Sequence, residues 1–289
     1  MLHRFLRPRP ASLRDGSKAL DEGRFGDAER QFRETLDGGF ESSAVWFDLA
    51  LAQKLQHHWA DAEASNLRAI ELDPKNKEAI WNLGVVATAL RHWDQSRWCW
   101  RQLGFEPTND SGPPTGDYGI TPVRLNPDAE GEVVWGWRID VCRIRLHSVP
   151  LPESGHRWDD VILHDVVPAG QRTFGGRTYS VFDELERMEP SAHQTHEVSV
   201  TCPTERDSEE LAELCYESGL GAEDWSAKVQ IICRTCSLGS PHSHDGSDVV
   251  LSADRRFAIA GPIDQVHARL HQWVDAGTGR SAGEISTYP

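Results

Sequence analysis

The sequence predicts an α+β protein, in which an N-terminal all-α array of three helix–turn–helix units precedes a C-terminal α+β domain. Three observations support this fold class. A 34-residue period runs through the first third of the chain, a loop-like segment rich in Pro and Gly follows, and short β-branched runs then alternate with helical patterns. The predicted domains are residues 1–110 and 117–289, joined by a linker at residues 111–116.

The N-terminal period is carried by residues that recur 34 positions apart. Small residues occupy one place in each unit (Gly16, Ala50 and Gly84), and large aromatic residues occupy a second place in the outer units (Phe32 and Trp100). Small side chains allow the two helices of a unit to approach closely, and large ones fill the space beside them. A helix pair cannot bury its apolar face alone, so about three stacked units are the minimum for stability.

Proline marks the ends of two units, because it cannot continue a helix. Leu-Asp-Pro at 72–74 and Phe-Glu-Pro at 105–107 both have this character. Together with Trp46, Leu49 and the small residues of the middle unit, this pattern resembles the tetratricopeptide repeat, a 34-residue helix–turn–helix unit. The resemblance covers units of about 9–42, 43–76 and 77–110. It implies an α-solenoid that takes part in protein–protein interaction.

The first helix of each unit has a second face that could bind a partner. Residues at i and i+4 share a helix face, and this spacing places a set of apolar side chains on the concave side: Leu13, Phe47, Leu51, Trp81 and Val85. The Lys, Asn and Arg set with which some members of the repeat family clamp a carboxylate is absent from these positions. The sequence predicts a hydrophobic groove for a partner helix or extended segment. The alternative is that the C-terminal half or the N-terminal arm of the chain fills the groove.

The charge of the chain limits the classes of partner. The net charge is −15, and residues 1–110 carry 15 Lys and Arg against 17 Asp and Glu, which leaves −13 for the remainder. An acidic C-terminal half argues against nucleic acid and against an anionic membrane surface. No apolar run approaches the roughly 20 residues of a membrane span, and no secretory signal is evident. We therefore expect a cytoplasmic protein with a protein partner, and a basic partner would suit an immunity or antitoxin role.

The pattern after the linker changes from helical to strand-like. Residues 117–190 contain short apolar runs broken by Pro and Gly, which predicts a small, mostly antiparallel β unit. Residues 195–275 alternate strands with helices, and the helices at about 207–218 and 262–274 have apolar residues at helical spacing. This order predicts a sandwich with helices on one side of a sheet.

The sharpest chemical motif is Cys233-x2-Cys236-x5-His242-x-His244. Two thiolates and two imidazoles form a common tetrahedral ligand set for zinc. Because these four residues would complete the coordination shell, such a zinc would be structural. Two alternatives remain open: a cysteine that is only a small core residue, with solvated loop histidines, or a redox-active dithiol.

A second candidate cluster contains His156, Asp160 and His164, where strand alternation places Asp160 and His164 on one face. Such residues can act as acid and base or hold a metal, but charged residues on an edge strand also protect it from aggregation. Phosphate-binding loops, nucleophile elbows and zinc-protease motifs are absent from the sequence. The sequence therefore favours a protein-binding adaptor over an enzyme. The alternative is a metal-dependent, zinc-containing enzyme whose repeats recruit the substrate.

Overall fold

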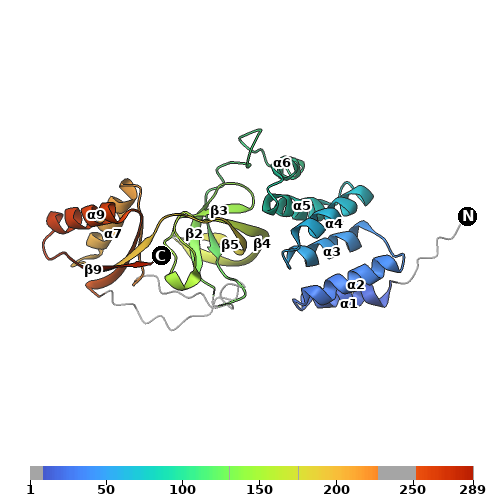
Figure 1. Ribbon diagram of the computed structural model, residues 1–289, viewed down its shortest axis with the longest axis horizontal. Helices are drawn as coiled ribbons and strands as arrows, with labels where there is room; N and C mark the ends of the chain where they lie inside the picture. Colours follow the sequence, from blue (N-terminus) through green and yellow to red (C-terminus); the bar gives the residue numbers. More distant parts are fainter. Residues whose placement is uncertain (1–8, 130, 175, 227–251, 289) are drawn as a thin grey trace, which may run out of the picture. The chain divides into compact units, whose positions relative to one another are not determined.

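A computed structural model describes residues 9–129, 131–174, 176–226 and 252–288 (Figure 1). The chain divides into two compact units, Met1–Gly116 and Asp117–Pro289. The first is helical and the second combines two sheets with helices, so the α+β fold class is confirmed. Each helix in these described ranges is too short or too polar to cross a lipid bilayer.

The first unit is a run of six helices that is consistent with a helical-repeat array. Successive helices form three antiparallel pairs with short connections (Figure 1). Their bounds are α1 Ala11–Asp21, α2 Phe25–Asp37, α3 Ser43–Lys54, α4 Trp59–Leu72, α5 Lys77–Ala89 and α6 Trp93–Gln102.

The 34-residue period is visible in the backbone conformation. Gly23, His57 and Arg91 lie at the same place in the three turns between paired helices, and all have positive φ, at 73°, 60° and 60°. Ser42 and Asn76, also 34 positions apart, are the N-caps of α3 and α5 and accept the backbone N–H of the third helical residue. Equivalent residues therefore perform equivalent structural roles in successive units.

Close packing explains the small residues of each pair. A Cβ atom added to Gly16 would lie 2.8 Å from Cε1 of Phe32, and one added to Gly84 would lie 2.6 Å from Cζ3 of Trp100. Both aromatic rings are completely buried. In the middle unit Ala50 replaces glycine, and the residue equivalent to the aromatic one is the smaller Asn66. The sizes of the two residues in a pair are therefore complementary.

The second unit begins with a closed five-stranded barrel in the order β1-β2-β3-β4-β5 (Figure 1). Neighbouring strands are antiparallel except at the closure, where β1 and β5 are parallel. The strands are β1 Ile120–Arg124, β2 Val133–Arg138, β3 Arg143–Leu146, β4 Val161–Phe174 and β5 Arg177–Glu189. A short 3-10 helix, η1 Pro152–Ser154, lies between β3 and β4.

The barrel is closed by side chains as well as by backbone pairing. Arg124 of β1 donates from Nε and Nη2 to the two carboxylate oxygens of Asp183 on β5, at 2.7 and 2.6 Å. A bidentate pair of this kind fixes geometry as well as charge. The apolar interior contains Val123, Leu125, Val134, Ile144, Leu146 and Ile162.

The chain then forms a four-stranded sheet in the order β7-β8-β6-β9. Its elements are β6 Thr195–Thr201, α7 Glu205–Glu217, β7 Gly221–Asp224, β8 Asp254–Ala260, α9 Ile263–Ala276 and β9 Ser281–Tyr288. Among the described residues, the order βαββαβ along the chain and the strand order of the sheet correspond to a split βαβ arrangement. The apolar side chains of α7 and α9 share one core with those of one sheet face, including Val198 and Phe257.

The opposite face of this sheet contacts the segment between β3 and β4. Val149 and Trp225 form a buried cluster with Ala258 and Ala260 of β8. Trp225 donates its indole N–H to the carbonyl oxygen of Val149 at 3.0 Å. The barrel and the sheet of the second unit therefore share a packed junction. Within the predicted run of strands and helices at 195–275, residues 227–251 lie outside the described residues.

Candidate functional site

Three of the predicted groove residues, Leu13 on α1 and Phe47 and Leu51 on α3, are half-buried. We call these three residues the repeat face. Leu13 also contacts the core formed around Phe32. The i,i+4 spacing of Phe47 and Leu51 within α3 gives them a common side of that helix.

The two groove residues predicted on α5 have more buried surroundings. Val85 is completely buried. Trp81 is half-buried, and its ring centroid lies 5.7 Å from that of Trp100 and 5.4 Å from that of Phe105. Trp81 therefore belongs to an aromatic cluster at the end of the array.

An acidic side chain accompanies the repeat face. Asp48 is half-buried and lies three positions before Leu51 on α3, a spacing that makes the two side chains neighbours on the helix surface. Burial raises the pKa of the Asp48 carboxyl to about 6, and the negative charge of Asp21 on α1 adds to this effect. In the part of the chain that the structure describes, Asp48 has no hydrogen-bonded or ion-paired partner. The repeat face therefore combines apolar surface with an uncompensated carboxyl group.

A group with metal-ligand chemistry occurs in the helical array, at a place that the sequence analysis did not single out. Ligand atoms of Glu29, His58 and Asp61 lie within 4.8 Å of one another. The guanidinium of Arg33 is 2.8 Å from Glu29 and 4.0 Å from Asp61. Arg33 already supplies positive charge to these carboxylates, so a metal ion would compete with it. The predicted zinc ligands Cys233, Cys236, His242 and His244 lie outside the described residues.

His156, a predicted catalytic candidate, forms a buried ion pair. Its Nε2 lies 2.6 Å from Oε1 of Glu184 on β5, and both side chains are largely buried. Burial lowers the pKa of His156, but the hydrogen bond and charge of Glu184 outweigh that effect and leave the pKa above its ordinary value. The backbone N–H of Asn126 donates to the other Glu184 oxygen. Glu184 thus connects three segments of the barrel.

Asp160 and His164, the other two candidates, have separate partners. Asp160 is completely buried and accepts the backbone N–H groups of Arg157 and Ser191 at 2.9 and 2.6 Å. His164 is also completely buried, and its Nδ1 lies 2.6 Å from the carbonyl oxygen of Asp165. Burial lowers the pKa of His164 to about 4, so the imidazole is neutral. Each of the three candidates therefore has its own set of contacts.

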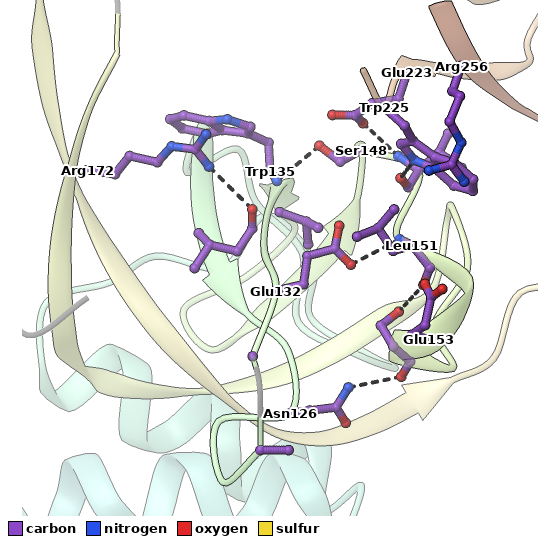
Figure 2. A pocket seen from close by; sticks show the side chains of 16 residues that line it. Asn126, Glu132, Trp135, Ser148, Leu151, Glu153, Arg172, Glu223, Trp225 and Arg256 are labelled. Carbon is purple, nitrogen blue, oxygen red and sulfur yellow. Dashed lines mark hydrogen bonds between the residues drawn. The ribbon is translucent and has the colours of Figure 1, made fainter. Parts of the chain in front are cut away.

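A cavity of about 640 Å³ lies at the junction of barrel and sheet in the second unit (Figure 2). Its lining comes from five parts of the chain: residues 126, 129 and 131–135; residues 148, 149, 151, 153 and 154; Arg172 of β4; Glu223 and Trp225; and Arg256 of β8. Pockets of roughly 300–1,000 Å³ with apolar walls and a few convergent polar groups are typical of small-molecule sites.

Two tryptophans in the cavity wall are each covered by an arginine. The guanidinium carbon of Arg172 is 5.3 Å from the ring centroid of Trp135, and that of Arg256 is 5.5 Å from Trp225. Arg256 also forms an ion pair with Glu197 at 2.6 Å. Figure 2 shows Trp135 and Trp225 at different sides of the cavity. The wall thus provides aromatic surface together with positive charge.

Two carboxylates enter the cavity from different elements and contact one short segment. Glu132 Oε2 accepts the backbone N–H of Leu151 at 3.0 Å, and Glu223 Oε2 accepts that of Val149 at 2.9 Å. Burial raises the pKa of Glu132 to about 7, and the negative charge of Glu223 contributes in the same direction. Glu132 therefore changes its protonation state near neutral pH.

This shift predicts a pH dependence of stability. Because the folded protein binds the Glu132 proton more tightly than the unfolded chain, the contribution of Glu132 to the free energy of unfolding should fall as pH rises from about 4.5 to about 7. Glu132→Gln removes this contribution. The free energy of unfolding of the variant minus that of wild type should therefore increase as pH rises across the same interval. Urea unfolding at pH 5 and pH 8 measures the difference. Glu153→Gln, at an exposed position on the cavity rim, should retain the wild-type slope, and a parallel slope for Glu132→Gln would contradict the assignment.

Comparisons with known proteins do not assign this chain. No family model matches the sequence, and no curated protein matches it. A proposal about function must therefore come from the residues and their geometry.

Proposed function

We propose that the protein is an adaptor that binds a partly apolar, basic segment of a partner protein through the repeat face. The apolar side chains Leu13, Phe47 and Leu51 would contact apolar residues of that segment, as in other recognition of helices or extended peptides by helical grooves. The resemblance of residues 9–110 to tetratricopeptide repeats supports the same role. Residues 117–289 would provide a second surface.

The observation that carries this proposal is Asp48. A half-buried carboxyl group one helical turn from Leu51, with Asp21 nearby and no ion-paired cation from the described part of the chain, is electrostatically unfavourable in its ionised form. A Lys or Arg of a partner would compensate this charge while its neighbours cover the apolar side chains. The partner is therefore expected to be basic, which agrees with the acidic character of the chain.

One specific form of the proposal is an immunity or antitoxin protein that acts on a basic toxin. Residues 111–289 carry a net charge of −13, which would attract such a partner over long range. Association would then slow strongly as salt is added. Association that is insensitive to salt would favour an adaptor of another kind.

A selection from displayed random peptides, with the full-length protein as target, tests the adaptor proposal. We expect enriched peptides to combine apolar residues with Lys or Arg. Their affinity, measured by fluorescence anisotropy, should fall at least tenfold in Phe47→Ala, consistent with a hot-spot residue. In wild type it should also fall below about pH 6, where Asp48 becomes protonated, and Asp48→Asn should remove this dependence.

The matched control is Leu67→Ala, which removes an exposed apolar side chain of α4 outside the repeat face. It should leave peptide affinity unchanged. Enrichment of peptides without basic residues, or equal binding by wild type and Phe47→Ala, would contradict the proposal.

A further inference from the structure

The guanidinium of Arg172 lines the cavity, and no carboxylate of the described residues forms a hydrogen bond or ion pair with it, although the negative charge of Glu223 acts on it at longer range. Its single hydrogen bond to the described part of the chain runs from Nη1 to the carbonyl oxygen of Val133, at 3.3 Å. The group is half-buried against Trp135, and burial lowers the pKa of Arg172. A planar guanidinium has five N–H donors that match a carboxylate. Most of these donors remain available to an acceptor that enters the cavity.

Glu132 presents the opposite charge in the same cavity. One of its oxygens accepts the Leu151 N–H, and no basic side chain of the described residues pairs with the other. Glu223 adds a second carboxylate, which is held on Val149. In Figure 2, Glu132 lies between Trp135 on one side and Leu151 and Trp225 on the other. The free oxygen can therefore accept hydrogen bonds from a cation that enters the cavity.

Arg172 and Glu132 line the same cavity, and neither a hydrogen bond nor an ion pair joins them. Arg172 is anchored to Val133, the residue that follows Glu132, whereas Glu132 is anchored to Leu151. Each charge is thus fixed in position by another contact. A ligand that compensates both must itself carry a negative and a positive group.

We propose that this cavity binds a small zwitterion of the amino-acid class. The carboxylate of the ligand would accept hydrogen bonds from Arg172, and its ammonium would donate to Glu132. Its apolar side chain would occupy the space bounded by Trp135, Val149 and Trp225. This site is within residues 117–289 and is independent of the repeat face.

The protonation of Glu132 gives the site a defined pH response. The charged groups around it are Glu223 from β7, Glu153 from η1, His156 and, across the cavity, Arg172. An ammonium ligand requires ionised Glu132, and the pKa of this carboxyl is about 7. Affinity should therefore rise between pH 6 and pH 8, and this rise should be absent in Glu132→Gln.

Thermal unfolding of the full-length protein with each of the twenty proteinogenic amino acids provides the first test, followed by calorimetry of those that stabilise. We expect stabilisation by at least one amino acid with an apolar or aromatic side chain. Phenethylamine and 3-phenylpropionate, which each lack one charge, should bind at least tenfold more weakly than phenylalanine if phenylalanine binds. Stabilisation by none of the twenty would overturn the proposal. Equal binding of the amine alone would assign the cavity to simple organic cations instead, and equal binding of the acid alone to anions.

Substitutions of the cavity residues test which side chains bind the ligand. Arg172→Ala and Glu132→Gln should each lower affinity at least tenfold, because each removes a charge-assisted hydrogen bond. Arg172→Lys keeps the charge but not the planar fork and should give an intermediate loss. Arg177→Ala, at an exposed position on β5 outside the cavity lining, is the matched control and should bind as wild type. Thermal unfolding without ligand verifies that each variant is folded, and unchanged affinity in a folded Arg172→Ala would overturn the assignment of the carboxylate.

Discussion

Replacing Gly84 by alanine is expected to lower the free energy of opening of the helical array by about 2 kcal/mol. At an unhindered position in a helix the same exchange is stabilising by up to about 1 kcal/mol. The sign reverses here because the new methyl group would lie 2.6 Å from Cζ3 of Trp100, whose ring is completely buried. Hydrogen exchange of peptides from α5 and α6 measures this free energy separately from the second unit.

A substitution of Trp100 provides the control for the predicted effect of Gly84→Ala. In a Trp100→Leu background the clash is absent, so Gly84→Ala should become neutral or stabilising, as the Ala50 and Asn66 pair of the middle unit indicates. Gly26→Ala provides a less hindered reference, because the nearest atom to its Cβ would be Oε1 of Gln56 at 3.3 Å. An equal cost of Gly84→Ala in both backgrounds would show that Trp100 is not the cause.

The second large effect is expected at Asp140, in the turn between β2 and β3. This carboxylate is 1% exposed and accepts hydrogen bonds from the backbone N–H of Cys142 and from both the backbone and Nε of Arg143. Asp140→Ala removes the carboxylate that lies 2.6 Å from the Nε of Arg143, a side chain that is itself 2% exposed. The loss of one partner of a buried pair typically costs about 3–5 kcal/mol. Hydrogen exchange of peptides from β2 and β3 measures the change.

Two further variants distinguish charge burial from the loss of any ion pair. Arg143→Met should cost less than Asp140→Ala, since Asp140 keeps its two backbone donors. Glu209→Ala removes an exposed partner of Arg206 at 3.4 Å and should cost less than about 1 kcal/mol. A cost of Asp140→Ala no larger than that of Glu209→Ala would contradict the prediction.

Local patterns were sufficient to predict the helical array. Its helices are stabilised by neighbours within 34 residues, so spacing, small residues and proline carry most of the information. The Leu-Asp-Pro sequence at 72–74 predicted the end of a helix, and α4 ends at Leu72. The βα alternation of the C-terminal region was also predictable, because α7 and α9 have apolar residues at helical spacing.

Strands stabilised mainly by backbone pairing were missed. β1 contains Pro122, which usually argues against a strand, and yet it pairs with Trp135 of β2. β7 has four residues, and β9 is largely exposed with a mostly polar sequence that shows no alternation of apolar residues. The barrel could not be predicted because its closure depends on the pairing of β1 with β5, which no local pattern encodes.

The cavity could not be predicted from the sequence either. Glu132 and Glu223 are 91 positions apart, and both are brought to the Val149–Leu151 segment by tertiary packing. The only local signal is an acidic residue directly before the apolar run Val133–Trp135, which is too common to indicate a site. Histidine and cysteine were predicted as site residues because they can bind metals and transfer protons. In the structure His156 and His164 have structural contacts within the barrel.

The parallel closure of the barrel has a consequence for how the chain reaches its fold. Val123 pairs with Phe182 and Arg124 pairs with Asp183, and the residues of each pair are 59 positions apart in the sequence. Closing so long a loop costs conformational entropy before any contact compensates it, and such non-local topologies are slow to form. The helical array needs only neighbouring contacts. During synthesis, residues 9–116 can therefore fold before β5 has left the ribosome. Until β5 is available, the edge of β1 that pairs with it is exposed to other chains.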